Sequence, residues 1–385
     1  MKKQDIKPNL VENEKEILKF WDDNQVFEKL KEQNKKTGKY FATMDGPITA
    51  NGMTMGLHHA FGRSLKDAMI KFRAINGYDM HYQNGFDAQG LWVEVNAEKD
   101  LGLNSKKDIE KYGIDKFTEY CMQKVKTCAS KMTEQSIRLG QWMNWDDSYF
   151  TNSDTNIETI WYFLKTCKQK GWLIEKYRPM PWCTRCGTSL SEHEMSDADA
   201  YRDDTCQAVF IKLPVINQDF KMLVWTTTPW TLSSNVAIAV NPELEYSICK
   251  VKSDDKLICV CSTATKVLKD DIISVERVVK GSELVGKTYE TCFEEFPLQN
   301  FEHKIVAWDQ VDATEGAGSV HIAPGCGAED FELGQSIGLP NICPIDDAGI
   351  FYNNFGFLSG LDANKDETRD LVFAELMQIQ LFELT

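Results

Sequence analysis

The sequence has 385 residues, of which 42% are hydrophobic, and a chain of this size can build two domains with apolar cores. Its net charge of −15 favours an acidic soluble protein, so contact with RNA would need a local basic patch such as the lysine-bearing stretch 165–178. Twelve cysteines without a secretory segment indicate a reducing compartment, and we expect a cytoplasmic protein. No apolar run reaches the ~18 residues of a membrane helix, so we expect no membrane partner.

The first predicted element is an amphipathic helix over residues 13–33. Ile17, Phe20, Trp21 and Leu30 recur along its apolar side. This pattern indicates a leading helical segment, which we place at residues 1–38.

A strand over residues 39–44 is followed by a loop with Gly52 and Gly56 and by a helix over 57–75, which begins near His58 and His59. A strand, a glycine-bearing turn and a helix N-terminus make a phosphate site, because free N–H groups and the helix dipole face an anion. Two imidazoles can add donors to a phosphate that gains charge during a reaction. The alternative is an ordinary helix start with two surface histidines.

A second strand is predicted over residues 78–83 and ends in a loop that contains Gly85, Asp87 and Gln89. Strand, helix and strand within so short a stretch form a βαβ unit with parallel strands. Ligands of such sheets bind at the carboxyl ends of the strands, so both loops should face one crevice. Asp87 is placed there to hold a ligand ammonium.

Two helical regions follow, and then the sequence changes character. Ser105 and Asp108 cap a helical region to about residue 139, and Thr155 and Glu158 are the predicted cap of a helix that ends at Gly171. From about residue 200 the chain is rich in short β-branched runs separated by turn residues. The predicted strands are 208–213, 222–227, 236–240, 246–251 and 257–261, which make residues 200–385 a β-rich domain after a domain over 39–199.

Two motifs in the β-rich part carry candidate chemistry. Thr226, Thr227 and Thr228 put three hydroxyls beside a strand end, although threonines are also good strand formers. A glycine-rich loop over 316–327 contains His321 and is followed by Asp330, and it could equally be a turn with solvated charges.

Cys183 and Cys186 have the spacing of half a zinc site. A full site normally needs four ligands, and the sequence contains no second pair with this spacing. His193 is a candidate third ligand. The alternative is two reduced cysteines in a turn.

These motifs resemble class I aminoacyl-tRNA synthetases of the isoleucyl, valyl and leucyl group, and isoleucyl enzymes most closely. The P-x-x-A-N-G element that precedes the family's H-I-G-H signature is matched from Pro47 through Asn51 to Gly52. The family's G-W-D-x-H-G-L-P-V-E is matched by residues 85–94, and its threonine-rich peptide and G-T-G-x-V-H-x-A-P-G-H-G-x-D-D motif by 225–232 and 316–330.

The resemblance implies an α/β fold with a Rossmann-like parallel-sheet catalytic half-domain and an inserted β-rich editing domain. It implies isoleucine, ATP with Mg²⁺, and tRNA as partners of a monomer, with Zn²⁺ as a further candidate. It assigns the catalytic role to His58 and His59. It assigns amino-acid and ATP binding to Pro47, Asn51, Gly52, Gly56, Gly85, Asp87 and Gln89. It assigns the editing pocket to Thr226, Thr227, Thr228, His321 and Asp330.

The sequence departs from the family at several positions. The signature has one extra residue, Met55 or Gly56 stands at its first histidine, and His58 stands at its glycine. Ala317 replaces a threonine and Cys326 a histidine of the later motif. The sequence contains no K-M-S-K-S-like loop, which leaves open a free-standing editing hydrolase or tRNA-binding fragment, or a non-catalytic remnant. A valyl or leucyl enzyme of the same group is a separate alternative.

Overall fold

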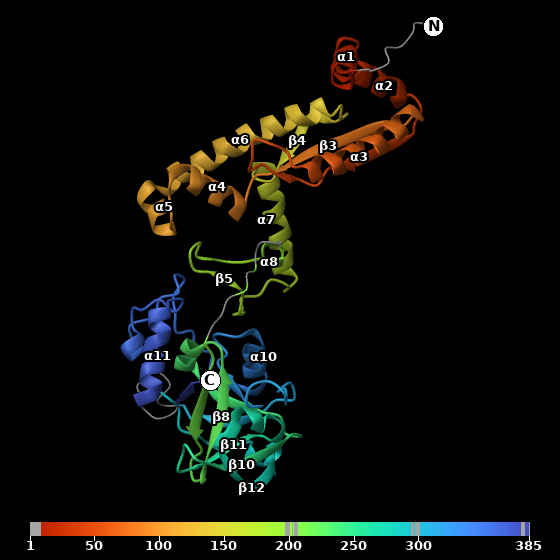
Figure 1. Ribbon diagram of the computed structural model, residues 1–385. Coiled ribbons are helices and arrows are strands. Elements are labelled where there is room, and N and C mark those ends of the chain that lie inside the picture. The colour runs from red at the N-terminus through yellow and green to blue at the C-terminus, as the bar shows by residue number, and fades with distance from the viewer. Residues whose placement is uncertain are drawn as a thin grey trace. The chain divides into compact units, whose positions relative to one another are not determined.

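The computed structural model describes residues 9–196, 201, 203, 207–293, 296, 301–378 and 382–384. The chain forms two compact units, which divide between Glu175 and Lys176 (Figure 1). None of the described helices combines the length and apolar character that a bilayer crossing requires.

The first unit is built on a parallel sheet, as the βαβ pattern predicts. Its strands are β1 (Tyr40–Met44), β2 (Ile48–Thr49), β3 (Asp79–Asp87) and β4 (Asn144–Phe150). β3 pairs in parallel with each of the other three strands. The carboxyl ends of β2 and β3 therefore meet at one edge, where Ala50 N–H donates to the Asp87 carbonyl at 2.9 Å.

Helix α3 (Leu57–Ile75) connects these strands and lies alongside β3 (Figure 1). Its buried residues, Arg63, Asp67, Ile70 and Ala74, follow the three- and four-residue spacing of one helix face. The predicted bounds of this helix, 57–75, are confirmed. Because α3 begins directly after the β2 loop, its N-terminus lies at the ligand-binding edge of the sheet.

The predicted leading helix is wrong in detail, because two helices, α1 (Leu10–Asp23) and α2 (Val26–Lys35), take its place. The break falls at Gln25, whose backbone is left-handed with φ of 50°. Poor helix formers, including Asp23 and Asn24, precede it. Of the predicted apolar side, Trp21 packs edge-on against Trp142 with ring centroids 5.4 Å apart. By contrast, Ile17 and Phe20 are about half exposed.

The long helical region is also divided, into α5 (Lys106–Tyr112) and α6 (Ile114–Arg138), with α4 (Leu91–Leu101) before them. Gly113 separates α5 from α6 with φ of +108°, which side chains other than glycine rarely adopt. The predicted cap of α5 is confirmed, since Ser105 Oγ accepts from the Asp108 N–H.

The cap predicted for helix α7 (Asp154–Gln169) is wrong. Ser153 caps it, accepting from the Asn156 N–H, so the helix begins before Thr155. The predicted end is confirmed by Gly171, which is left-handed at φ +73° just beyond the helix.

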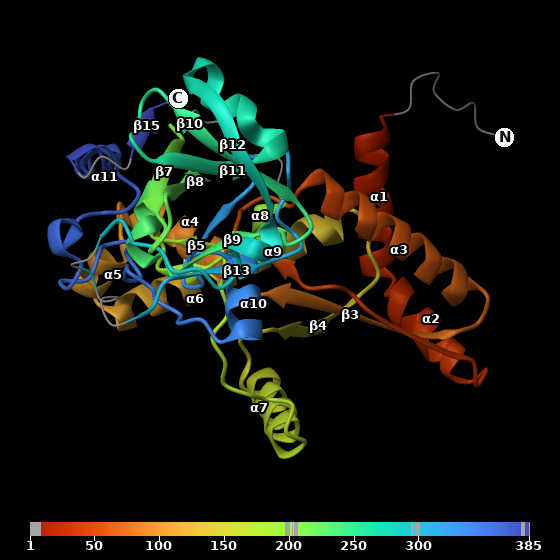
Figure 2. The same ribbon diagram turned by 90° about the horizontal axis from the view of Figure 1, so that it is seen from below.

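The second unit contains a nine-stranded mixed sheet with one large apolar core (Figure 2). All five predicted strands are present, as β7 to β11, and β12 to β15 were not predicted. The strands of this sheet are β7 (Val209–Pro214), β8 (Phe220–Thr226), β9 (Ala237–Val240), β10 (Glu245–Val251), β11 (Leu257–Cys261), β12 (Ile272–Lys280), β13 (Lys304–Ala307), β14 (Val320–Ile322) and β15 (Phe382–Leu384).

A small hairpin and short helices complete the second unit. The hairpin is β5 (Trp182–Cys183) with β6 (Thr188–Ser189), and Trp182 Nε1 donates to the Asp347 carbonyl at 2.8 Å. Residues after 176 thus pack with the second unit, although the sequence changes character only near residue 200. The remaining helices are α8 (Glu192–Met195), α9 (Gly281–Leu284), α10 (Ala328–Ile337), α11 (Asp366–Gln378) and the 3₁₀ helices η1 (Pro229–Ser234), η2 (Ser262–Asp271) and η3 (Gly356–Leu358).

Candidate active site and hydrolytic pocket

The first candidate site lies at the N-terminus of α3. Gly56 is the N-cap residue, and no side chain caps the free N–H groups of the first turn. His58 and His59 project from this turn with their Nε2 atoms 3.1 Å apart. Uncapped N–H groups beside two imidazoles form a site suited to an anion.

The absence of a side chain at Gly56 makes room for the His58 ring. A Cβ added at Gly56 would lie 2.7 Å from His58 Cε1, which is closer than van der Waals contact allows. The imidazole of His58 therefore occupies the space that a side chain at position 56 would enter. In the signature alignment that places His59 at the second histidine, glycine and histidine have exchanged positions 56 and 58.

The surroundings of His59 disfavour its charged form. Burial, His58 and the nearby Arg63 lower the pKa of His59. In the contact between the two rings, one Nε2 donates and the other accepts. His59 Nδ1 is buried and has no hydrogen-bond partner among the described residues. Arg63 is itself buried and pairs with Asp45 at 3.1 Å.

Asp87 lies at the end of β3, where the structure builds a ring of donors around its carboxylate. The hydroxyls of Thr49 and Thr151 lie 3.4 and 3.2 Å from its oxygens, and the Gln89 N–H donates to it at 3.3 Å. These contacts fix the carboxylate at the edge shared with the α3 loop. No Lys or Arg of the described chain pairs with Asp87, so it remains able to accept a ligand ammonium.

The other predicted binding residues of this unit lie near the ends of β2 and β3 but not all in loops: Pro47 precedes β2, and Gly85 lies inside β3, which runs to Asp87 and not to the predicted end at residue 83. Pro47 and Gln89 are exposed, and Asn51 and Gly52 are half-buried. Gly85 is buried beneath Tyr149, because an added Cβ would lie 2.2 Å from Tyr149 Cζ. Its lack of a side chain is thus required for packing, a reason that the motif alone does not reveal.

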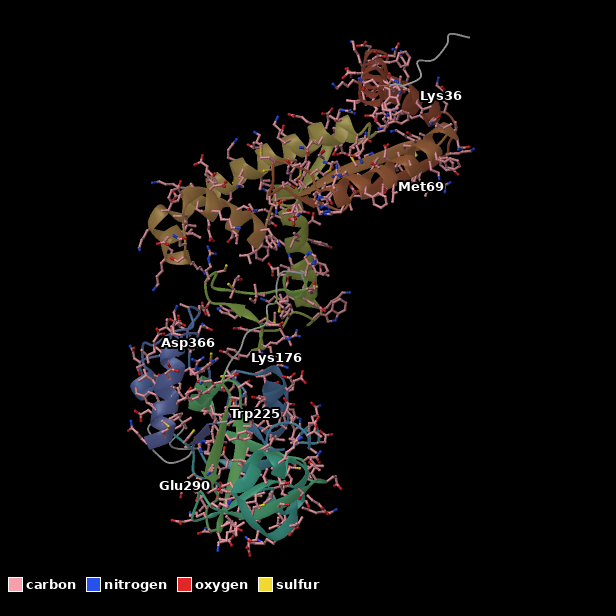
Figure 3. All side chains as sticks on the ribbon, viewed as in Figure 1. Lys36, Met69, Lys176, Trp225, Glu290 and Asp366 are labelled. Atoms are coloured by element: carbon pink, nitrogen blue, oxygen red, sulfur yellow. The ribbon has the colours of Figure 1, made fainter. Side chains whose placement is uncertain are left out.

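The second candidate site is a cavity of about 540 Å³ in the second unit. It brings together all five predicted editing residues from segments about a hundred positions apart. β14 joins these segments, because Val320 pairs with Trp225 of β8, the labelled residue in Figure 3. Its described lining also includes Thr231, Trp308 and Gln310. The charged residues of the described lining are all acidic: Asp312, Glu315, Glu329 and Asp330.

His321 is held neutral in the cavity wall by partners on both ring nitrogens. Asn235 Nδ2 donates to Nδ1 at 2.8 Å, and the Asn235 amide is oriented by Tyr289, whose hydroxyl donates to Oδ1 at 2.6 Å. Nε2 therefore carries the proton and donates to Thr231 Oγ1 at 2.9 Å, and Thr231 donates to the Thr228 carbonyl. This chain ties the histidine to the threonine segment.

The titration of His321 should make the stability of the second unit depend on pH. Burial lowers its pKa to about 4. The unfolded chain gains this proton near pH 6.5 and the folded chain only near pH 4, so stability is full above pH ~6.5 and falls by up to about 3 kcal/mol on acidification to pH ~4. We expect urea unfolding of a His321→Gln variant to show less acid destabilisation than the parent. Equal pH dependence in the two proteins would contradict this.

Asp330 lies in the first turn of α10, and its carboxylate accepts from the Ala323 N–H at 2.9 Å. Burial nevertheless raises its pKa, because no cation compensates the charge among the described lining residues. A ligand ammonium in the cavity would supply that charge. Cys326 also lines the cavity, where burial raises the pKa of its thiol to about 12, and Ala317 is fully buried in the core instead.

Cys183 and Cys186 face each other across the β5–β6 turn, and the Cys186 N–H donates to Cys183 Sγ. Burial raises the pKa of the Cys186 thiol. No third ligand, including His193, joins them within the described parts of the chain. The pair supplies two of the four ligands of a zinc site and does not form one by itself.

Several residues that build the sites were not predicted. In the first site these are Tyr149 of β4 and Thr151, which follows β4. In the second site, Asn235 and Tyr289 orient His321, and neither belongs to the two motifs. Thr231 lies three residues after Thr228, and its place in the segment 225–232, which matches the family's threonine-rich peptide, is the signal that could have identified it.

Comparison with known proteins defines the family. Residues 16–282 match the family model described as tRNA synthetases class I (I, L, M and V), and the chain belongs to this family. It is 38% identical over 364 residues to the isoleucine–tRNA ligase of Methanothermobacter thermautotrophicus, covering 93% of this chain and 34% of that protein. The isoleucine–tRNA ligase of Archaeoglobus fulgidus is 38% identical over 376 residues, covering 94% of this chain and 36% of that protein.

A further relative, the isoleucine–tRNA ligase of Thermobifida fusca, is 36% identical over 342 residues, covering 88% of this chain and 32% of that protein. The chain thus spans about a third of the length of the curated relatives that it matches.

Proposed function

We propose that this chain is part of an isoleucine–tRNA ligase that activates isoleucine with ATP and transfers it to tRNA. The observation that carries the proposal is the joint placement of the uncapped α3 N-terminus, the histidine pair and Asp87 at one edge of a parallel sheet. The identity to several isoleucine–tRNA ligases across most of the chain supports the choice of amino acid.

The residues of the first unit suit the activation step. Asp87 would hold the α-ammonium of isoleucine, and its carboxylate would be oriented by Thr49 and Thr151. ATP would enter as its magnesium complex, with the α-phosphate at the α3 N-terminus. His58 and His59 would donate to the phosphate oxygens as charge builds on them. Pro47, Asn51, Gly52 and Gln89 would line the amino-acid and adenosine sides of the loops.

Activation is proposed for the full-length protein, because the first unit presents an uncovered apolar surface. Along α3 one stripe of large apolar residues is more than half exposed, and Met69, labelled in Figure 3, lies on it. A stripe of this size normally packs against another layer of protein. Its members are Leu57, Phe61, Leu65, Met69, Phe72 and Ile75.

The cavity of the second unit suits hydrolysis of a wrongly charged tRNA. One methylene is worth only about 1–3 kcal/mol, so a pocket for isoleucine cannot reject valine well, and isoleucyl enzymes are the standard example of this limit. Thr226, Thr227 and Thr228 would contact the terminal adenosine, and Asp330 would hold the ammonium of the misplaced amino acid. Four carboxylates without a Lys or Arg in the described lining favour a cationic group there.

We further place the protein in the cytoplasm as a monomer. Every described cysteine is a free thiol, which supports a reducing compartment. Zinc remains a proposal for the Cys183 and Cys186 pair, and no step of the reaction is assigned to it.

Exchange of pyrophosphate into ATP by the full-length protein tests the activation step. We expect the highest kcat/KM with isoleucine, lower values with valine and the lowest with leucine. Greatest turnover with valine or leucine would reject the isoleucyl assignment, and no exchange with any of the three would reject a ligase. If no exchange occurs but the protein hydrolyses aminoacyl-tRNA, the free-standing editing function would be favoured.

A further inference from the structure

The loop that leads to the histidine pair has no regular hydrogen bonding of its own. Residues 50–56 connect β2 to α3 without forming a helix or a strand. Ala50 and Met55 are the buried residues of this loop, and both pack in the core cluster that includes Phe86 and Met132. The loop therefore needs another source of hydrogen bonds to hold one path.

Gln135 of α6 supplies two of these hydrogen bonds from a single amide. Its Oε1 accepts from the Met55 N–H at 2.7 Å, and its Nε2 donates to the Met53 carbonyl at 3.1 Å. The two contacts are complementary, as in a strand pair, and they come from a residue 80 positions away in the sequence. Met53 and Met55 are thus fixed to α6 immediately before Gly56.

The next residue of α6 holds the helix that carries the histidines. Ser136 is completely buried, and its Oγ accepts from Arg63 Nη1 at 2.9 Å. Arg63 lies one turn after His59 on α3, and its Nη2 donates to Asn84 Oδ1 at 2.8 Å. One turn of α6 therefore fixes both the loop before the histidine pair and the helix after it.

We propose that Gln135 is a positioning residue for the histidine pair, which holds Met53 to Met55 so that His58 and His59 face a phosphate at the α3 N-terminus. The inference rests on the proposed function of this site. The amide of Gln135 is engaged by the loop through both of its polar atoms, so its effect should fall on the rate of the chemical step rather than on binding of isoleucine. Misplacement of a reacting group by ~1 Å can cost about a hundredfold in rate.

The test is a Gln135→Met variant, which keeps the length of the side chain and removes the amide. In the full-length protein we expect kcat for isoleucine-dependent pyrophosphate exchange to fall about ten- to a hundredfold, with KM for isoleucine within about twofold. Gln123→Met, an exposed glutamine of the same helix, is the matched control and should leave both constants unchanged. Gln135→Glu keeps the acceptor for the Met55 N–H, so its kcat should lie between those of the parent and Gln135→Met.

A second measurement separates positioning from a general loss of structure. In the 385-residue chain, the imidazole NMR resonances of His58 and His59 should shift in Gln135→Met and keep their parental positions in Gln123→Met, while those of His81 on β3 should be the same in all three proteins. An active parent whose Gln135→Met variant keeps the parental kcat, or whose His58 and His59 resonances are unchanged, would overturn the inference. An inactive parent would instead count against the proposed function.

Discussion

Replacing His59 with alanine is expected to lower the rate of isoleucyl-adenylate formation by about a hundredfold while changing isoleucine binding little. The imidazole lies at the uncapped α3 N-terminus, where its contact with the phosphate should strengthen as charge develops. Single-turnover adenylate formation, with isoleucine binding measured separately, checks this. Equal rates in variant and parent would show that His59 only supports the structure.

The exchange of glycine and histidine at positions 56 and 58 provides the control. His58→Gly should also reduce the rate, and Gly56→His alone should not raise it, because the new side chain competes with the His58 ring for the same space. The double variant, Gly56→His with His58→Gly, restores the family order and should recover much of the lost rate. A larger effect at His58 than at His59 would instead mean that the extra residue of the signature is placed wrongly.

The second large effect is expected at Asp330. Replacing it with asparagine keeps an acceptor for the Ala323 N–H and removes the charge that would hold the substrate ammonium. Hydrolysis of valyl-tRNA for isoleucine should slow about tenfold or more, or broaden towards isoleucyl-tRNA, because a charge-assisted contact is worth about 1.5–3 kcal/mol.

Glu332→Gln is the matched control for this change. Glu332 lies on the same helix and lines the neighbouring cavity of about 470 Å³ but not the cavity that contains Asp330, so its loss of charge should leave hydrolysis unaffected. If Asp330→Asn and Glu332→Gln behave alike, the assignment of the ammonium to Asp330 is wrong.

The sequence predicts the elements of both units where the signal is local. The helix 57–75 and the five strands from 208 to 261 follow from periodicity and turn residues, and the structure contains them. The breaks at Gln25 and Gly113 were missed, because each depends on a single backbone conformation inside an otherwise helical pattern. Helix propensity does not predict the backbone conformation at such positions when tertiary packing determines it.

The residues of the candidate sites likewise divide into those with a local sequence signal and those without one. Motifs predict a role for residues such as His59, Asp87 and Thr226, because the proposed chemistry requires those residue types at fixed spacings. The residues that orient them, such as Gln135 and Asn235, come from distant segments and carry no local pattern. Their roles follow only from tertiary hydrogen bonds.

The most direct measurement is hydrolysis of valyl-tRNA and isoleucyl-tRNA, both made with the tRNA for isoleucine, by the 385-residue chain. The second unit has its own apolar core and contains the five predicted editing residues in one cavity, so activity should not depend on the uncovered α3 stripe. We predict release of valine well above the uncatalysed rate and about tenfold or more faster than release of isoleucine. Release of neither amino acid, or faster release of isoleucine, would contradict the assignment of an isoleucyl enzyme with an editing pocket.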